Sequence, residues 1–125
     1  MAIERPPQDK GDNVITFTRI NRIWSYVFGD SSVAGSQTAT FNVTSNYLYP
    51  CNCSGGAITA NLPAAAGCSG KRFAFKKTDN TVNAVTIDAS GSDTIDGAGT
   101  KTLTAQYQVV EVISDGVSTW HIMHS

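Results

Sequence analysis

Residues 38–44 read TATFNVT, and in this stretch the sequence takes on a period of two. Its three apolar residues alternate with threonine and asparagine, which is the pattern of a strand that buries one face. The alternation recurs in KRFAFKK at residues 71–77, where Phe73 and Phe75 share one face and Arg72 and Lys76 share the other. Both stretches therefore predict β-structure.

Further strand patterns follow at similar spacing, at residues 47–53, 57–62, 84–88, 102–113 and 117–123. Pro50 in the first of these indicates a strand edge or a bulge, since proline cannot donate a ladder hydrogen bond. Residues 102–113 form the longest pattern and favour a bulged or broken pair of strands, and Asp115-Gly116 after them is a hairpin signal. About seven short strands at this spacing predict an all-β, antiparallel β-sandwich or barrel-like domain.

Two connecting segments carry weaker patterns. Residues 63–70 predict a loop or a single helical turn, and residues 89–99 predict a turn-rich excursion anchored by Ile95. The predicted core is formed by apolar residues on alternating positions, namely Phe73, Phe75, Val85, Ile87, Leu103, Val110, Val112, Trp120 and Ile122. Burying a side chain of this kind contributes about 1.5–3 kcal/mol before chain entropy is subtracted.

Composition supports the same fold class. Valine and isoleucine together number nineteen in 125 residues, whereas leucine occurs three times, so helical bundles are excluded as the main body. The net charge of −1 argues against a nucleic-acid binder, which needs a strongly basic face. The apolar runs are too short to span a membrane, and we expect no secretory signal in the polar first twelve residues.

Residues 1–37 are predicted to form an N-terminal attachment arm and linker, and residues 38–125 the β-domain. Residues 1–13 indicate an extended arm, because Pro6-Pro7 favours extended backbone. Such a segment is either a disordered tail or an arm that orders on a partner. Residues 30–37 are small and polar, which is typical of a flexible linker.

Residues 14–28 (VITFTRINRIWSYVF) are the densest apolar stretch. Their β-branched residues favour a strand over 14–18, whereas helical spacing of apolar residues favours a short helix or irregular turn over 20–28. This segment either packs on its own core or docks on another subunit. The expected virion attachment residues, explained by the resemblance below, are Phe17, Ile20, Ile23, Trp24 and Phe28.

Three sets of short sequence motifs occur in the second half of the chain. LPAAAG leads into a basic strand that ends in KKTD (residues 62–79), TIDG is followed by LTAQY (residues 94–107), and SDG is followed by tryptophan after three residues (residues 114–120). Through them the stretch from Gly55 to Ile122 resembles a β-domain that recurs in bacteriophage tail fibres and related virion appendages. The first 37 residues carry no such resemblance.

The resemblance implies a non-catalytic structural module of the virion, made in the host cytoplasm and usually homotrimeric. Its expected partners are copies of itself and another virion protein of the capsid, neck or tail. Trimerisation would cover open strand edges and add buried area to a small domain. At 125 residues there is little room for both a fibre shaft and a receptor-binding tip, which favours a head decoration or cement protein, or a short tail-fibre-type protein.

The basic cluster is formed by Lys71, Arg72, Lys76 and Lys77. It indicates either a solvated strand face or a subunit contact in which one protomer's basic strand faces acids of the next. The subunit contact would join Arg72, Lys76 and Lys77 to Asp93 and Asp96, with Asp88 as a further acid. Phosphate binding ranks third, because no glycine-rich loop precedes a helix.

The acids Asp88, Asp93 and Asp96 are candidates for calcium ligands or for turn formation. Their spacing differs from that of an EF-hand loop, and no bidentate glutamate follows at the required position. Turn formation is therefore the favoured role.

The cysteines Cys51, Cys53 and Cys68 could join a histidine in a metal site. Their spacing departs from that of structural zinc sites, so ordinary thiols are favoured. His121 and His124 could serve a hydrolytic triad, but the chain has no G-x-S-x-G nucleophile elbow. We therefore expect no enzymatic activity, no cofactor and no metal.

Tyr47, Tyr49 and Tyr107 are the candidate glycan contacts, because aromatic faces suit sugar rings. Strand tyrosines with ordinary cross-strand partners are the favoured alternative. A carbohydrate-binding module that recognises a host surface glycan is accordingly the second functional hypothesis.

Overall fold

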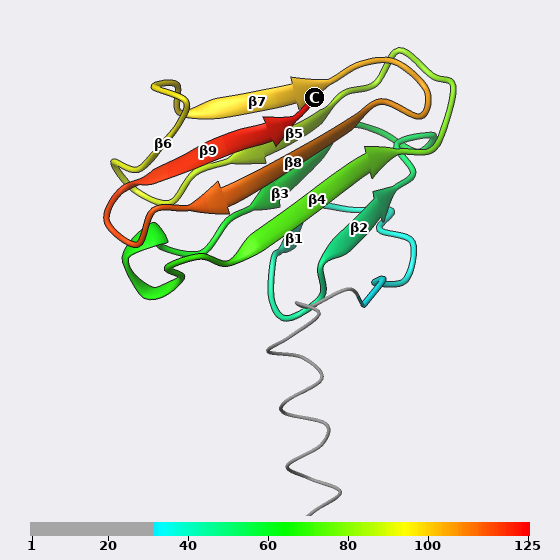
Figure 1. Cartoon of the computed structure of the whole chain (residues 1–125). Helices are drawn as coiled ribbons and strands as arrows, with labels where there is room; N and C mark the ends of the chain where they lie inside the picture. The colour runs from blue at the N-terminus through cyan, green and yellow to red at the C-terminus, as the bar shows by residue number, and fades with distance from the viewer. Residues whose placement is uncertain (1–31) are drawn as a thin grey trace, which may run out of the picture. The chain divides into compact units, whose positions relative to one another are not determined.

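The computed structural model describes residues 32–125 of the chain (Figure 1). The predicted arm, strand and helix of residues 1–28 lie outside the described residues. So do the expected attachment residues Phe17, Ile20, Ile23, Trp24 and Phe28, which remain predictions. Within residues 32–125, no helix has the length and apolar character needed to cross a membrane.

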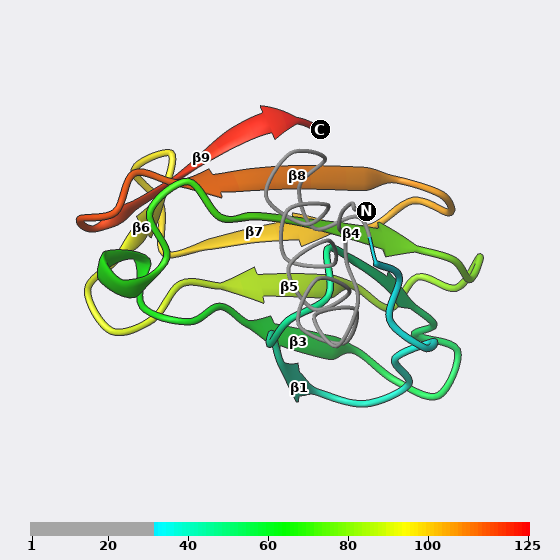
Figure 2. The same cartoon turned by 60° about the horizontal axis from the view of Figure 1, so that its bottom comes forward.

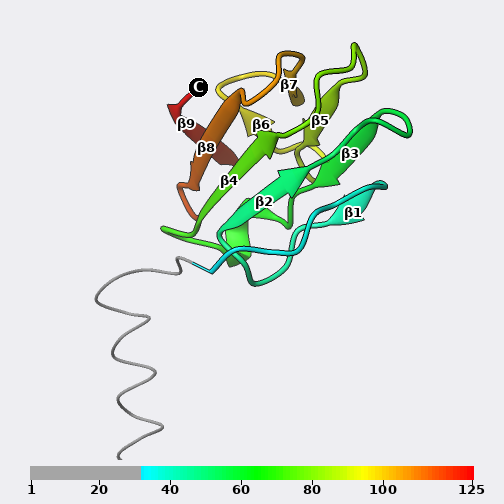
Figure 3. The same cartoon turned by 90° about the vertical axis from the view of Figure 1, so that its right-hand side faces the viewer.

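Strands dominate the described residues and form two facing sheets (Figure 3). The four-stranded sheet consists, in spatial order, of β1 (Phe41–Asn42), β3 (Ile58–Asn61), β5 (Val85–Asp88) and β7 (Thr100–Leu103). The five-stranded sheet consists of β2 (Leu48–Cys51), β4 (Arg72–Lys77), β8 (Val109–Ser114), β9 (Thr119–His124) and β6 (Thr94–Ile95). The predicted all-β, two-sheet architecture is confirmed.

Strands β1 to β5 alternate between the two sheets, so the chain winds around the core (Figure 2). Neighbours within a sheet therefore run parallel in the pairs β1–β3, β3–β5 and β2–β4. The later strands return antiparallel in β4–β8, β5–β7 and β8–β9, whereas β6 is parallel to β9. Both sheets are therefore mixed, whereas the sequence led us to expect antiparallel strands. The alternation of apolar and polar residues is the same in parallel and antiparallel strands, so it does not distinguish the two pairings.

The segment before β1 lies along β2, the outermost strand of its sheet. Val33 and Gln37 form parallel bridges to Leu48 and Cys51, and the Gln37 N–H donates to the Pro50 carbonyl at 2.8 Å. Residues 30–37 were expected to form a flexible linker. Residues 32–37 instead pair through their backbone with β2, so that expectation is wrong for this part of the segment. Pro50 lies at the sheet edge, as the sequence predicted.

The core lies between the sheets and contains eight of the nine predicted residues in buried positions. The ninth, Ile122, is half-buried, beside an irregularity in the β8–β9 pairing at Glu111 and Val112. Rings meet across the interior: Tyr49 stacks on Phe41 and Phe75 with centroids 5.3 and 5.7 Å apart. Such pairs add about 0.5–1.5 kcal/mol beyond their buried area.

The connecting segments also follow the sequence. Residues 65–67 form a single 3-10 turn within the predicted loop 63–70. Ile95 is buried and anchors the excursion of residues 89–99. The long pattern at residues 102–113 is divided between β7 and β8, as the prediction of a broken pair allowed.

Candidate functional site

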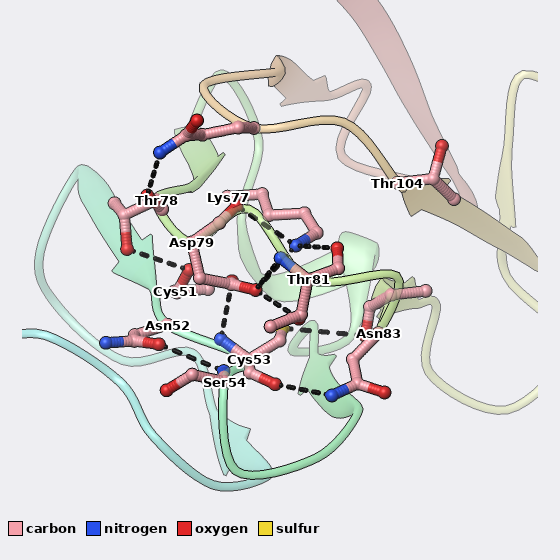
Figure 4. Close-up of polar contacts among 12 residues, drawn as sticks. Cys51, Asn52, Cys53, Ser54, Lys77, Thr78, Asp79, Thr81, Asn83 and Thr104 are labelled. Atoms are coloured by element: carbon pink, nitrogen blue, oxygen red, sulfur yellow. Dashed lines mark hydrogen bonds and ion pairs between the residues drawn. The ribbon is translucent and has the colours of Figure 1, made fainter.

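A buried ion pair organises one end of the sandwich (Figure 4). Lys77 ends β4 with a fully buried side chain, and its Nζ lies 2.8 Å from Oδ2 of Asp79. The other two ammonium hydrogens can serve the carbonyls of Asp79 and Thr81, at 3.2 and 2.9 Å. Because this charge is satisfied inside its own chain, the expectation that Lys77 contacts another subunit is corrected.

The carboxylate of Asp79 joins this pair to the β2–β3 loop. Its Oδ1 accepts the backbone N–H of Cys53 at 2.7 Å, and its Oδ2 accepts the backbone N–H and the hydroxyl of Thr81. Desolvation acts to raise the pKa of Asp79, but these hydrogen bonds and the Lys77 ammonium outweigh it and hold the pKa well below its usual range. Asn83 adds a second link by donating its amide to the Cys53 carbonyl at 2.8 Å.

The β7–β8 loop, residues 104–108, is tied to the same end. The Tyr107 N–H donates to the Lys77 carbonyl at 2.6 Å, and the Gln106 amide donates to the Thr78 carbonyl at 3.3 Å. The Gln108 side chain accepts the backbone N–H groups of Thr104 and Ala105 at 2.8 and 3.1 Å. This network connects three loops that are far apart in sequence.

The three candidate glycan tyrosines lie in different surroundings. Tyr49 is buried, and its hydroxyl accepts the backbone N–H groups of Thr44 and Asn46, so the structure contradicts its role as a sugar contact. Tyr47 is half-buried and donates its hydroxyl to Glu111. Tyr107 is 62% exposed, and Lys76 Nζ lies 5.4 Å from its ring centroid.

Glu111 is the second buried charge that sequence reasoning missed. Burial, the hydrogen bond to Glu111 and its negative charge raise the pKa of Tyr47 to about 12. Arg72 Nη1 and His124 Nε2 lie 3.9 and 3.8 Å from the Glu111 carboxylate. A lone acid within the apolar run VVEVIS was the available signal, because a buried carboxylate requires partners.

The loop aspartates bind backbone N–H groups. Asp93 accepts the N–H of Ala65 at 2.9 Å, and Asp96 accepts that of Ile122 at 3.1 Å. Asp115 accepts the N–H groups of the three residues that follow Gly116 in the β8–β9 turn. Asp96 lies in the turn after β6 with a φ of +49°, as a turn-forming role requires, whereas the carboxylates of Asp93 and Asp96 bind segments distant in sequence and Asp88 lies on β5. Among residues 32–125, no three acidic, histidine or cysteine side chains are grouped to hold a metal ion.

The thiols are free in the described domain. Cys51 and Cys53 are buried, and Cys68 is half-buried. Desolvation, with a smaller contribution from Cys53, raises the pKa of the Cys51 thiol to about 12. Desolvation is also the main cause of the raised pKa of Cys53. Cysteines in such surroundings behave as small apolar core residues.

The predicted subunit contacts are not gathered on one surface element. Arg72 begins β4 with a side chain that is 57% exposed, and Lys76 near the end of that strand lies over Tyr107. Asp93 precedes β6 and Asp96 follows it. Contacts of these residues with a second copy stay a prediction.

Neither a protein-family model nor a curated protein matches this chain. Fold and site together define an all-β, two-sheet domain whose distinctive polar side chains stabilise its own loops.

Proposed function

We propose that the chain is a non-enzymatic structural protein of a bacteriophage virion, a homotrimeric appendage of the head-decoration or short tail-fibre type. One observation carries the proposal. In the sequence motifs through which the chain resembles virion appendage domains, the polar residues organise loops and turns. A scaffold uses polar side chains in this way, whereas an active site directs them toward a substrate.

Each of these sequence motifs supplies residues that stabilise the core, a loop or a turn. KKTD supplies the buried pair of Lys77 and Asp79. TIDG supplies buried Ile95 and the Asp96 carboxylate that holds β9. SDG-x₃-W supplies the hairpin turn and the fully buried Trp120. LPAAAG supplies the 3-10 turn, whose Ala65 N–H is bound by Asp93.

The sheet edges support assembly. In the described residues, β1 and β7 are the outermost strands of the four-stranded sheet, so each has one edge without a neighbouring strand. Open edges are sites of unwanted pairing, and symmetric association of identical chains covers them. A trimer would also increase the buried fraction of a 13.2 kDa protein.

Light scattering coupled to size exclusion tests the oligomer. We expect a mass three times the 13.2 kDa of one chain, independent of concentration in the micromolar range. A stable particle of one chain mass under virion-like salt conditions would contradict the homotrimer.

Deletion of residues 1–30 tests the attachment segment. We expect the shortened chain to keep the β-sheet circular dichroism of the domain and to be missing from purified phage particles in an immunoblot. The expectation rests on the apolar density of residues 14–28. Incorporation equal to that of the full chain would show that attachment lies in residues 31–125.

A further inference from the structure

Tyr107 occupies a backbone conformation that a bulky residue normally avoids. It is the third residue of a turn closed by the Gln108 N–H and the Ala105 carbonyl at 3.1 Å, and its φ is +65°. Glycine and asparagine are the usual residues at such positions, because a Cβ disfavours positive φ. Strain of this kind persists where surrounding contacts determine the conformation, and it concentrates at binding sites.

The surroundings do determine the conformation here. The Tyr107 N–H is bound by the Lys77 carbonyl, and the Gln108 side chain binds the start of the loop. The same Lys77 carries the buried ion pair with Asp79. The phenol ring is therefore presented on a rigid base, which lowers the entropy cost of binding a ligand.

The polar surroundings of the ring are positive. Lys76 Nζ lies 5.4 Å from the ring centroid. Residues 104–108 contain no charged residue, and the one acid of residues 78–83, Asp79, is bound to Lys77. Lys76 forms no ion pair with any of residues 32–125, and an aromatic surface beside such an ammonium group suits a ligand that combines an apolar ring face with a negative charge.

We propose that Tyr107 and Lys76 form a glycan-binding site for an acidic sugar. The sugar ring packs on the exposed phenol ring of Tyr107, and the sugar carboxylate pairs with the Lys76 ammonium. Uronic and sialic acids have this chemistry. This role of Lys76 replaces its predicted contact with a second copy, and the site does not depend on how the chain is anchored.

Binding of the full-length chain to a printed array of defined oligosaccharides tests the proposal, with acidic sugars (uronic and sialic acids) compared with neutral ones (glucose, galactose and N-acetylglucosamine). We expect acidic sugars to be preferred. Tyr107→Asn should reduce their binding at least about tenfold, while the melting temperature stays equal or rises because asparagine accepts positive φ. Lys76→Gln should remove the preference for acidic over neutral sugars.

Val117→Ser is the matched control, since Val117 is also exposed but lies in the β8–β9 turn, at the other end of β8 from Tyr107. It should leave binding unchanged. Failure to bind any acidic sugar, equal binding of neutral ones, or full binding by the folded Tyr107→Asn variant would overturn the proposal. The mass of each sample is measured in parallel, so a failure of trimer formation is recorded separately from a failure of glycan binding.

Discussion

Lys77 and Asp79 are two residues apart in the chain, and their side chains meet inside the protein with Nζ 2.8 Å from Oδ2. Through Asp79 the pair holds the Cys53 N–H, and through its carbonyl Lys77 holds the Tyr107 N–H. The ion pair thus links the β2–β3 and β4–β5 loops, while the backbone carbonyl of Lys77 ties the β7–β8 loop to the same residue.

The two halves of this pair should respond differently to mutation. Asp79→Asn leaves the fully buried Lys77 ammonium without its counter-ion, and we expect the melting temperature to fall by about 10 °C or more. Lys77→Met removes the buried charge, fills the space with a flexible unbranched side chain and leaves Asp79 with its backbone donors, so the loss should be smaller. Differential scanning calorimetry measures both. An equal loss in the two variants would contradict the dominance of the unpaired ammonium.

Acid should weaken the domain through the same carboxylate. The folded pKa of Asp79 lies below that of the unfolded chain, so its contribution is complete above the unfolded pKa of about 4 and is lost as pH falls toward the folded pKa. Urea unfolding between pH 6 and about 2.5 should show a falling free energy of unfolding. The Asp79→Asn variant should show a shallower fall. Parallel curves for the two proteins would exclude Asp79 as a source of the acid sensitivity.

Strand positions could be predicted from sequence because alternation is local, but the partner of each strand could not. Phe41 pairs with Ala60 in a parallel arrangement only because β2 lies in the other sheet, and a period of two carries no such information. The buried lysine did leave a signal. Lys77 has the same parity as Phe73 and Phe75, so the alternation directs it inward with them.

The loop end was harder to predict. Asp79 reads as a turn residue in KKTD, and nothing local indicates that its carboxylate reaches Cys53 in a loop 26 residues earlier. The positive φ of Tyr107 is likewise invisible in a sequence where glycine or asparagine would mark it. Both features arise from contacts between distant segments, which single-sequence patterns do not contain.

The thiols should differ in reactivity in the folded protein. Cys51 and Cys53 are buried and have raised pKa values, so alkylation by iodoacetamide at pH 8 should reach them only after unfolding. Cys68 is half-buried and should be labelled first. Mass spectrometry of peptides after timed labelling measures each site, with Cys68→Ser as the control. Labelling of Cys51 as fast as Cys68 without denaturant would contradict the buried position of the β2 thiol.

Two turn glycines form a matched pair for separating backbone strain from steric conflict. Gly97 and Gly116 have φ values of +88° and +81°, so alanine is strained at both, by about 1–2 kcal/mol. A Cβ at Gly97 meets nothing within 4 Å, whereas at Gly116 it would lie 2.7 Å from Cβ and Oγ of Ser69. We therefore expect Gly116→Ala to lower the free energy of unfolding more than Gly97→Ala.

The double variant Ser69→Gly with Gly116→Ala separates the two causes, because it removes the side chain that the new Cβ would meet. We expect it to recover part of the loss, measured against Ser69→Gly alone, and to leave the strain of a positive φ. Urea unfolding gives each free energy. Equal losses in Gly97→Ala and Gly116→Ala would mean that the Ser69 side chain moves aside at no cost, and the hairpin turn would then be limited by its backbone conformation alone.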